Sequence, residues 1–185
     1  MKDSVPPMRT TPLRPIKFID GNVSIQRLAE DLRRFSVIGL DVETTLGASK
    51  YICLIQIATP EYTALVDAWT LRGDISALRD ILESPLVLKV IHNASFEQLR
   101  FLDRGVTLRN IYDTLTADKH LNPQHGTHNL KDVVARELDV EMDKAQQTSD
   151  WRARPLSPAQ RQYAALDAEV LLDLYARFSP RMPKT

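Results

Sequence analysis

Residues 37–43 read Val-Ile-Gly-Leu-Asp-Val-Glu, an apolar run that closes on two carboxylates. Because side chains alternate across a β-strand, we expect Asp41 and Glu43 on the same face of one strand. Like charges at neighbouring positions of one face repel, and burying a carboxylate at the end of a core strand is costly. A divalent cation would remove this conflict, since Mg²⁺ prefers carboxylate oxygens and water. Two solvated carboxylates at a strand end are the alternative interpretation.

The segments around this stretch predict one α/β domain. Strands are expected at residues 36–40, 51–58, 62–66 and 86–91, and a short one near 106–111; the first three are expected to be consecutive and antiparallel. Helices are expected after the candidate N-cap residues Ser24, Asp74, Ser95, Asp113, Thr127 and Ser157. Strands followed by mixed strands and helices are typical of an α/β domain with a mixed sheet.

The last helix has the clearest start signal in the chain. Ser157 is the expected N-cap, Pro158 takes the first helical position, and Gln160 completes a capping box. Farther along, Tyr163 and Asp167 stand four residues apart and therefore share a helix face. A carboxylate within the apolar pattern of a helix is unusual unless something neutralises it. A surface aspartate and a core tyrosine are the structural alternative.

Glu97 is a third candidate carboxylate. It falls in the first turn of the helix expected after the strand at 86–91, within the run His92-Asn93-Ala94-Ser95-Phe96-Glu97. The helix dipole favours an acidic residue at this place, so a purely structural role also explains it.

Composition excludes several classes of protein. The chain has 185 residues, with 24 basic and 24 acidic side chains, so it lacks the basic excess typical of a pure nucleic-acid-binding module. The single cysteine, Cys53, excludes an internal disulfide and is expected to be a buried apolar residue. No membrane span or signal-peptide core is present in the sequence, so we expect a cytoplasmic protein without a membrane partner. The proline-rich residues 1–16 are expected to form a flexible leader.

Taken together, these motifs resemble the DEDD superfamily of 3′→5′ exonucleases. The resemblance is carried by Asp41-Val42-Glu43, Glu97 five residues after His92, and Tyr163-Ala164-Ala165-Leu166-Asp167. The tyrosine is typical of the DEDDy subclass. The runs Ser149-Asp150-Trp151-Arg152-Ala153-Arg154-Pro155-Leu156, Ile55-Gln56-Ile57, Asp113-Thr114 and His128-Asn129-Leu130-Lys131 resemble the ribonuclease D branch, so that the similarity covers about residues 18 to 178.

The resemblance implies an RNase H-like α/β fold with a mixed five-stranded sheet flanked by helices, over residues 17–180, followed by a tail at 181–185. It implies hydrolysis of single-stranded nucleic acid from its 3′ end, with RNA favoured over DNA, and release of 5′-mononucleotides. Two divalent metal ions, Mg²⁺ or Mn²⁺, would be held by Asp41, Glu43, Glu97 and Asp167, with Tyr163 orienting the attacking water. Thr44, Leu46, His92 and Asn93 match positions that contact the substrate, although His92 also fits a structural histidine.

The chain departs from the family pattern in two places. Glu97 stands where the family has an aspartate, and the C-terminal helical RNA-binding domains of full ribonuclease D enzymes are missing from the sequence, which suggests short oligonucleotides as substrates. Lys144, Arg152, Arg154 and Arg161 could steer phosphates or be ordinary surface charges, whereas Trp151 is expected to be a packing residue. A catalytically inactive RNA-binding or protein-interaction module and a DNA proofreading exonuclease are the competing functions.

Overall fold

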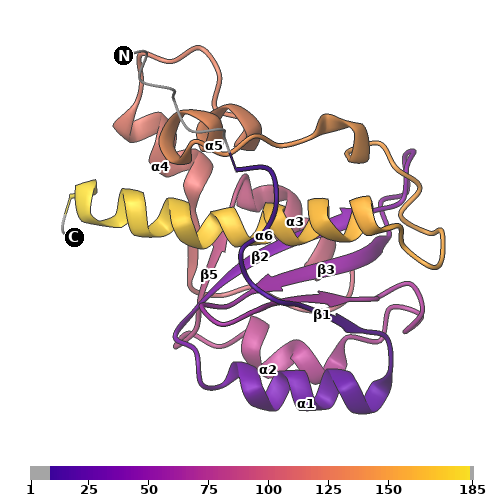
Figure 1. Cartoon of the computed structure of the whole chain (residues 1–185). Helices are drawn as coiled ribbons and strands as arrows, with labels where there is room; N and C mark the ends of the chain where they lie inside the picture. Colours follow the sequence, from indigo (N-terminus) through magenta and orange to yellow (C-terminus); the bar gives the residue numbers. More distant parts are fainter. Residues whose placement is uncertain (1–8, 184–185) are drawn as a thin grey trace.

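The structure, a computed structural model, describes residues 9–183, which form a six-stranded mixed sheet with helices on both faces (Figure 1). The strands are β1 (Ile16–Ile19), β2 (Val37–Thr44), β3 (Ile52–Ala58), β4 (Thr63–Val66), β5 (Leu88–Ile91) and β6 (Ile111–Asp113). The helices are α1 (Asn22–Leu32), α2 (Arg79–Leu82), α3 (Ala94–Leu102), α4 (Thr114–Leu121), α5 (Leu130–Leu138) and α6 (Pro158–Phe178). Short 3₁₀ turns lie at η1 (Ser76–Leu78), η2 (Lys144–Gln146) and η3 (Ser179–Arg181).

The strands lie in the order β1-β4-β3-β2-β5-β6. As expected, β2, β3 and β4 are antiparallel neighbours in sequence order, whereas β5 and β6 are added in parallel beside β2. The expected α/β fold with a mixed sheet is confirmed, but the expected count of five strands was one too low. The additional strand is β1, which pairs in parallel with β4 at the far edge and lies across the boundary of the expected leader.

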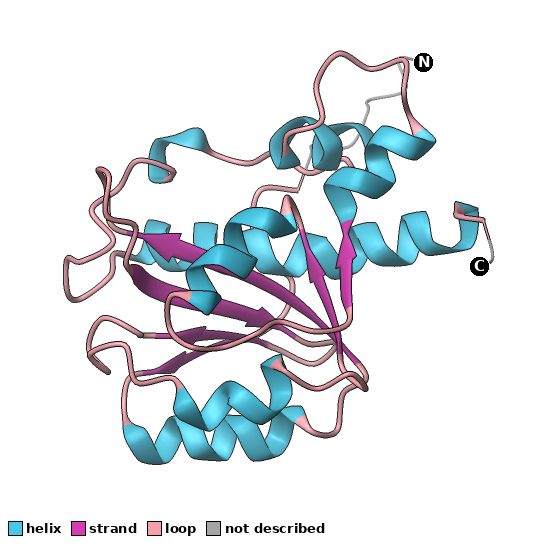
Figure 2. Cartoon of the chain, turned by 180° about the vertical axis from the view of Figure 1, so that it is seen from behind, coloured by secondary structure: helices cyan, strands magenta, loops and turns pink. Residues whose placement is uncertain are grey.

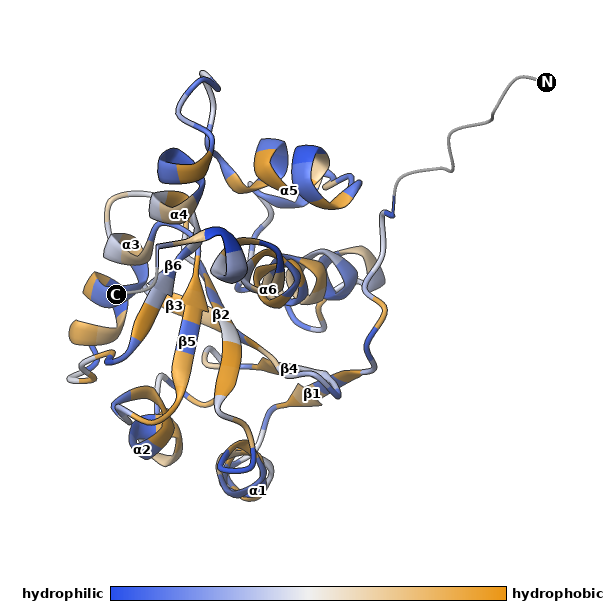
Figure 3. Cartoon of the chain, turned by 90° about the vertical axis from the view of Figure 1, so that its left-hand side faces the viewer, coloured by the Kyte–Doolittle hydropathy of each residue, from blue (hydrophilic) through white to orange (hydrophobic). Residues whose placement is uncertain are grey.

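Helices cover the two faces of the sheet unequally. The long helix α6 crosses β2, β3 and β4 on one face, with α4 and α5 packed beside it, and α1, α2 and α3 lie on the other face (Figures 1 and 2). Hydrophobic residues concentrate on the strands between these layers (Figure 3). Two smaller expectations are confirmed, since Cys53 and Trp151 are buried. Within residues 9–183, none of the helices is both long and apolar enough to cross a membrane.

The N-terminal segment differs from the expected flexible leader in its second half. Residues 1–8 lie outside the described residues, but Arg9 donates from Nη1 to Glu169 at 2.8 Å and from Nη2 to Asp173 at 2.8 Å. The backbone N–H groups of Leu13 and Arg14 also donate to the fully buried Glu169 carboxylate. Residues 9–14 are therefore fixed along α6 by charge pairs and hydrogen bonds.

At the other end of the chain, Arg181, the first residue of the expected tail at 181–185, also contacts the domain. Arg181 belongs to η3 and pairs with Glu137, while residues 184–185 lie outside the described residues.

Two helix starts were predicted correctly. Ser157 caps α6 with Gln160 as its box partner, and Asp113 caps α4, both as expected. Other starts were displaced by two or three residues. The cap is Gly21 rather than Ser24 for α1, Asn93 rather than Ser95 for α3, and Asn129 rather than Thr127 for α5; after Asp74 the chain forms η1 and α2 in place of one helix.

Candidate active site

The site begins where β2 extends past the end of β5. The register of β2 with β5 covers residues 37–39, whereas β2 continues to Thr44 and stays paired with β3. Asp41 and Glu43 stand on this extension and point to one face of the sheet, as their spacing predicted. This face is the one that α6 covers, because Gly39, two residues before Asp41, packs directly beneath Ala168.

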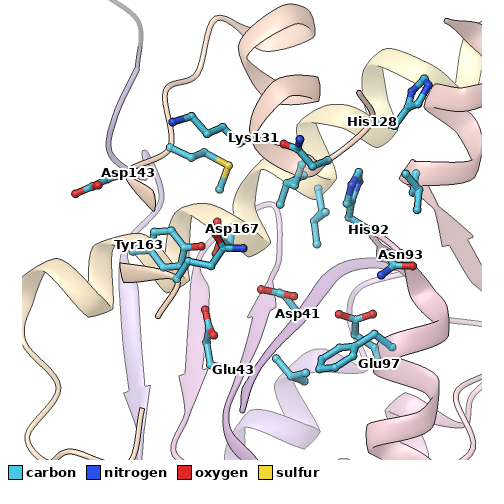
Figure 4. A pocket seen from close by; sticks show the side chains of 18 of the residues that line it. Asp41, Glu43, His92, Asn93, Glu97, His128, Lys131, Asp143, Tyr163 and Asp167 are labelled. Carbon is cyan, nitrogen blue, oxygen red and sulfur yellow. The ribbon is translucent and has the colours of Figure 1, made fainter. Parts of the chain in front are cut away.

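Helix α6 brings the next two groups to this place. Tyr163 and Asp167 project from one side of the helix toward β2 (Figure 4). One carboxylate oxygen from each of Asp41, Glu43 and Asp167 lies within 4.8 Å of the others. Residues from two elements more than 120 positions apart in sequence thus form one compact acidic cluster.

Glu97 completes the constellation from the opposite side of Asp41. It lies in the first turn of α3, which follows β5, and Figure 4 shows Asp41 between Glu43 and Glu97. The turn into α3 is made by Asn93, whose φ of 66° is left-handed, and the Asp113 carboxylate accepts hydrogen bonds from the backbone N–H groups of Asn93 and Ala94. Asp113 therefore fixes the start of the helix that carries Glu97.

Burial and mutual repulsion disfavour the charged forms of these carboxylates. Burial raises the pKa of Asp41 from its ordinary value of 3.8 to about 6. Burial, and next the nearby Asp41 charge, raise the pKa of Glu97 from 4.5 to about 9. The same two causes hold the pKa values of Glu43 and Asp167 well above their usual range. Four acidic groups in one place are therefore stable together only when protons or cations neutralise them.

These residues fit divalent metal ions. Oε2 of Glu97 is buried and has no hydrogen-bond partner within residues 9–183. Native proteins satisfy nearly all buried polar atoms, so such an oxygen needs an external partner. Only carboxylates are present in the cluster, and hard cations such as Mg²⁺ and Mn²⁺ bind such oxygen ligands.

Tyr163 is suited to donate a hydrogen bond. Burial, and next the neighbouring Asp167 carboxylate, raise the pKa of its hydroxyl far above the ordinary value of 10. The phenol therefore stays protonated at any working pH. Tyr163 lies one helical turn before Asp167 on α6, and both side chains line the same pocket.

The cluster lines one part of a pocket of about 760 Å³. His92 and Asn93, both expected to contact substrate, are also in its lining. His92 Nδ1 is hydrogen-bonded to the Thr114 hydroxyl at 2.9 Å. Burial lowers the pKa of His92, which favours a neutral imidazole. Thr44 and Leu46, in contrast, are not among the lining residues, and Leu46 is exposed.

Sequence reasoning missed the cationic side of this pocket. Lys119 of α4 and Lys131 of α5 line it, together with His128. His128 Nδ1 lies 2.6 Å from Oδ2 of the buried Asp118, which is also paired with Arg136. The run His128-Asn129-Leu130-Lys131 was recognised as part of the resemblance, but its position on a helix start facing the carboxylates required the fold.

Three of the four proposed phosphate-steering cations, Arg152, Arg154 and Arg161, do not line the pocket. Arg154 donates to the Asp67 carboxylate from Nε at 2.6 Å, Arg152 pairs with Asp150, and Arg161 lies over the Phe18 ring. The side chain of Lys144 is outside the described set. The three arginines thus have structural partners, and among the described side chains Lys119 and Lys131 are the lysines that face the site.

Comparison with known proteins agrees with this geometry. Residues 16–183 match the 3′-5′ exonuclease family, and the protein belongs to that family. Exosome complex exonuclease RRP6 of Saccharomyces cerevisiae is 32% identical over 163 residues, which are 85% of this chain and 22% of that protein.

Solved structures share the fold closely. RNase D of Escherichia coli, an exoribonuclease involved in structured RNA processing, aligns with a TM-score of 0.81 at 29% identity, over 89% of this chain and 44% of that one. NrnC of Brucella melitensis bound to pGG aligns with a TM-score of 0.77 at 26% identity, over 91% of this chain and 81% of that one, and has also been solved with bound Mg²⁺. The chain therefore spans less than half the length of RRP6 or RNase D.

Proposed function

We propose that the protein is a metal-dependent 3′→5′ exonuclease of the DEDDy type, which removes 5′-mononucleotides from single-stranded RNA. The observation that carries the proposal is the convergence of Asp41, Glu43 and Asp167 within 4.8 Å, next to Glu97 and Tyr163 in one pocket. Membership of the 3′-5′ exonuclease family gives the polarity. The likeness to RRP6 and to RNase D favours RNA.

Two divalent ions, Mg²⁺ or Mn²⁺, would supply Lewis-acid chemistry, stabilising the attacking and leaving oxygens and lowering the pKa of water. Asp41, Glu43 and Asp167 would hold one ion, and Glu97 would help to hold the other beside Asp41. The bound Mg²⁺ reported for NrnC supports the choice of metal.

The remaining residues position substrate and water. The protonated Tyr163 hydroxyl orients the attacking water by a hydrogen bond, because a phenol with so high a pKa is a poor general base. His92 and Asn93 face the terminal nucleotide, and Lys119 and Lys131 attract its phosphates from the other side of the pocket. Short oligonucleotides are the proposed substrates, which the oligonucleotide-bound NrnC structure supports.

The experiment uses 5′-labelled single-stranded oligomers of RNA and of DNA with the same sequence. We expect Mn²⁺ or Mg²⁺ to give a descending ladder on RNA with a free 3′-hydroxyl, and EDTA to abolish it. A 3′-phosphate should block digestion, since the pocket accepts a strand end. Cleavage of a circular single strand would contradict exonuclease action, and faster digestion of DNA than of RNA would overturn the substrate preference.

A further inference from the structure

Gln56 of β3 lies directly opposite Asp41 of β2. Side chains at directly opposed positions of an antiparallel pair share one face, with Cβ atoms about 4.5–5.5 Å apart. On this face Gln56 stands between Leu54, which packs with Ala164 and Ala165 of α6, and Ala58, which packs with Ala168. Its carboxamide is therefore enclosed beneath α6, beside the Asp41 carboxylate.

This carboxamide is an anomaly in the core. Gln56 is fully buried, and neither Nε2 nor Oε1 has a hydrogen-bond partner within residues 9–183. An unsatisfied buried amide destabilises a fold, because its lost hydrogen bonds to water are not replaced. Every other residue of β3 is apolar, so a hydrophobic side chain at position 56 would satisfy the packing of the core better than glutamine does. A glutamine at this position indicates a polar role.

Asp167 provides the matching acceptor. Its Oδ1 atom is also buried without a partner in the described part of the chain. Asp167 lies on α6 between Ala165, which packs with Leu54, and Ala168, which packs with Ala58. One of its carboxylate oxygens lies within 4.8 Å of one from Asp41. An unpaired donor and an unpaired acceptor thus border the same interior region next to Asp41.

We propose that Gln56 is a positioning residue of the active site, whose Nε2 group donates a hydrogen bond to Oδ1 of Asp167 while the other oxygen of that carboxylate holds a divalent ion. The proposal rests on the proposed metal-dependent function. Groups that hydrogen-bond metal-ligating carboxylates orient them, and their removal typically lowers metal affinity or activity 10–100-fold. Gln56 would thereby fix the distance between Asp167 and Asp41.

Gln56→Met tests this because methionine keeps the unbranched shape and removes the amide. Thr63→Val is the matched control, since Thr63 of β4 is equally buried and its Oγ1 also has no partner among the described residues. The full chain is compared by thermal unfolding without metal, by calorimetric titration with Mn²⁺, and by kcat and KM on a 5′-labelled RNA oligomer.

We expect both variants to keep or raise the midpoint of metal-free unfolding. Gln56→Met alone should lose Mn²⁺ affinity and kcat by about 10–100-fold, with KM little changed. Wild-type Mn²⁺ affinity and kcat in Gln56→Met would overturn the proposal and leave Gln56 as a core residue. If the wild-type protein itself neither bound Mn²⁺ nor digested RNA, the proposed function would fail instead, so the two failures are distinguishable.

A measurement on the wild-type chain covers the case in which Gln56→Met does not fold. Hydrogen exchange of the Gln56 side-chain amide, followed by NMR, should be slower with Mg²⁺ than without it, because the bound ion fixes the Asp167 carboxylate with Oδ1 toward the amide. Equal exchange rates in the two conditions would likewise overturn the proposal.

Discussion

Gly39 of β2 and Ala168 of α6 approach so closely that a Cβ atom on Gly39 would lie 2.4 Å from the Ala168 carbonyl oxygen. Gly39 is two residues before Asp41 on the same face of the strand, and Ala168 directly follows Asp167. The missing side chain at position 39 therefore determines how near the helix carboxylate comes to the strand carboxylates. Close backbone contact is thus a condition of the acidic cluster.

Gly39→Ala should push α6 away from β2. Overpacking of this kind typically costs about 1–3 kcal/mol of unfolding free energy, and a displacement of about 1 Å at Asp167 can lower kcat by about 10²-fold. Gly126→Ala is the control, because a Cβ at Gly126 meets nothing within 4 Å. Denaturant unfolding and RNA digestion measure both effects. Wild-type kcat in Gly39→Ala would contradict the claim that this contact sets the site.

Tyr163→Phe removes only the hydroxyl that we propose orients the attacking water. We expect kcat to fall by about 10²-fold or more while Mn²⁺ affinity, measured by calorimetry, persists. The control is Tyr112→Phe, since the Tyr112 hydroxyl is buried without a described partner and lies outside the pocket lining. An unchanged rate for Tyr163→Phe would leave that ring with a packing role alone.

Substitutions of Glu97 test whether its side chain, one methylene longer than aspartate, takes the role of the aspartate in the family pattern. Glu97→Gln keeps the size but removes the charge that a metal ligand needs, so activity should be severely impaired. Glu97→Asp keeps the charge but withdraws the oxygens by about one C–C bond, so it should be weaker than wild type, better than the amide, and dependent on more metal. Rates across a Mn²⁺ titration give this order. A fully active Glu97→Gln would reduce Glu97 to a first-turn helix residue.

The stability of the metal-free protein should depend on pH with a definite sign. The pKa of Asp41 rises to about 6 and that of Glu97 to about 9 in the folded state, so the folded protein binds more protons than the unfolded chain between about pH 4 and pH 9. The free energy of unfolding is therefore highest at the acid end of this window and falls as pH rises through it. Thermal unfolding in EDTA measures the slope.

Divalent ions should reverse this trend, because metal binding requires deprotonated ligands and strengthens with pH. Asp41→Asn and Glu97→Gln should each flatten the fall seen in EDTA. A metal-free midpoint that rose from pH 5 to pH 8 would show that these carboxylates are not held in a repulsive cluster.

The convergence of the carboxylates could be predicted from the sequence better than the edge strand β1 and the N-terminal segment. Asp41 and Glu43 share a face because strand alternation is a local rule, and Ser157 with Gln160 starts α6 because a capping box is a local set of hydrogen bonds. The family resemblance joined these local features to Glu97, whose position beside Asp41 depends on how far β2 extends past β5.

Long-range pairs could not be predicted in this way. Arg9 and Glu169 are 160 residues apart, so the composition of the N-terminal segment gave no sign of its fixed position. Arg154 resembled a phosphate contact until the fold placed Asp67 beside it. The burial of Gln56 beneath α6 likewise follows from the packing of a helix on a strand that lies 100 residues earlier.

The charge pairs of residues 9–14 decide how far the chain can be shortened for laboratory work. A truncation that begins after Arg14 would leave the buried Glu169 carboxylate without Arg9 and without two backbone donors. Removing one partner of a buried ion pair costs about 3–5 kcal/mol, which is a large share of the 5–15 kcal/mol that stabilises a typical domain. Recombinant versions should therefore begin at or before Arg9.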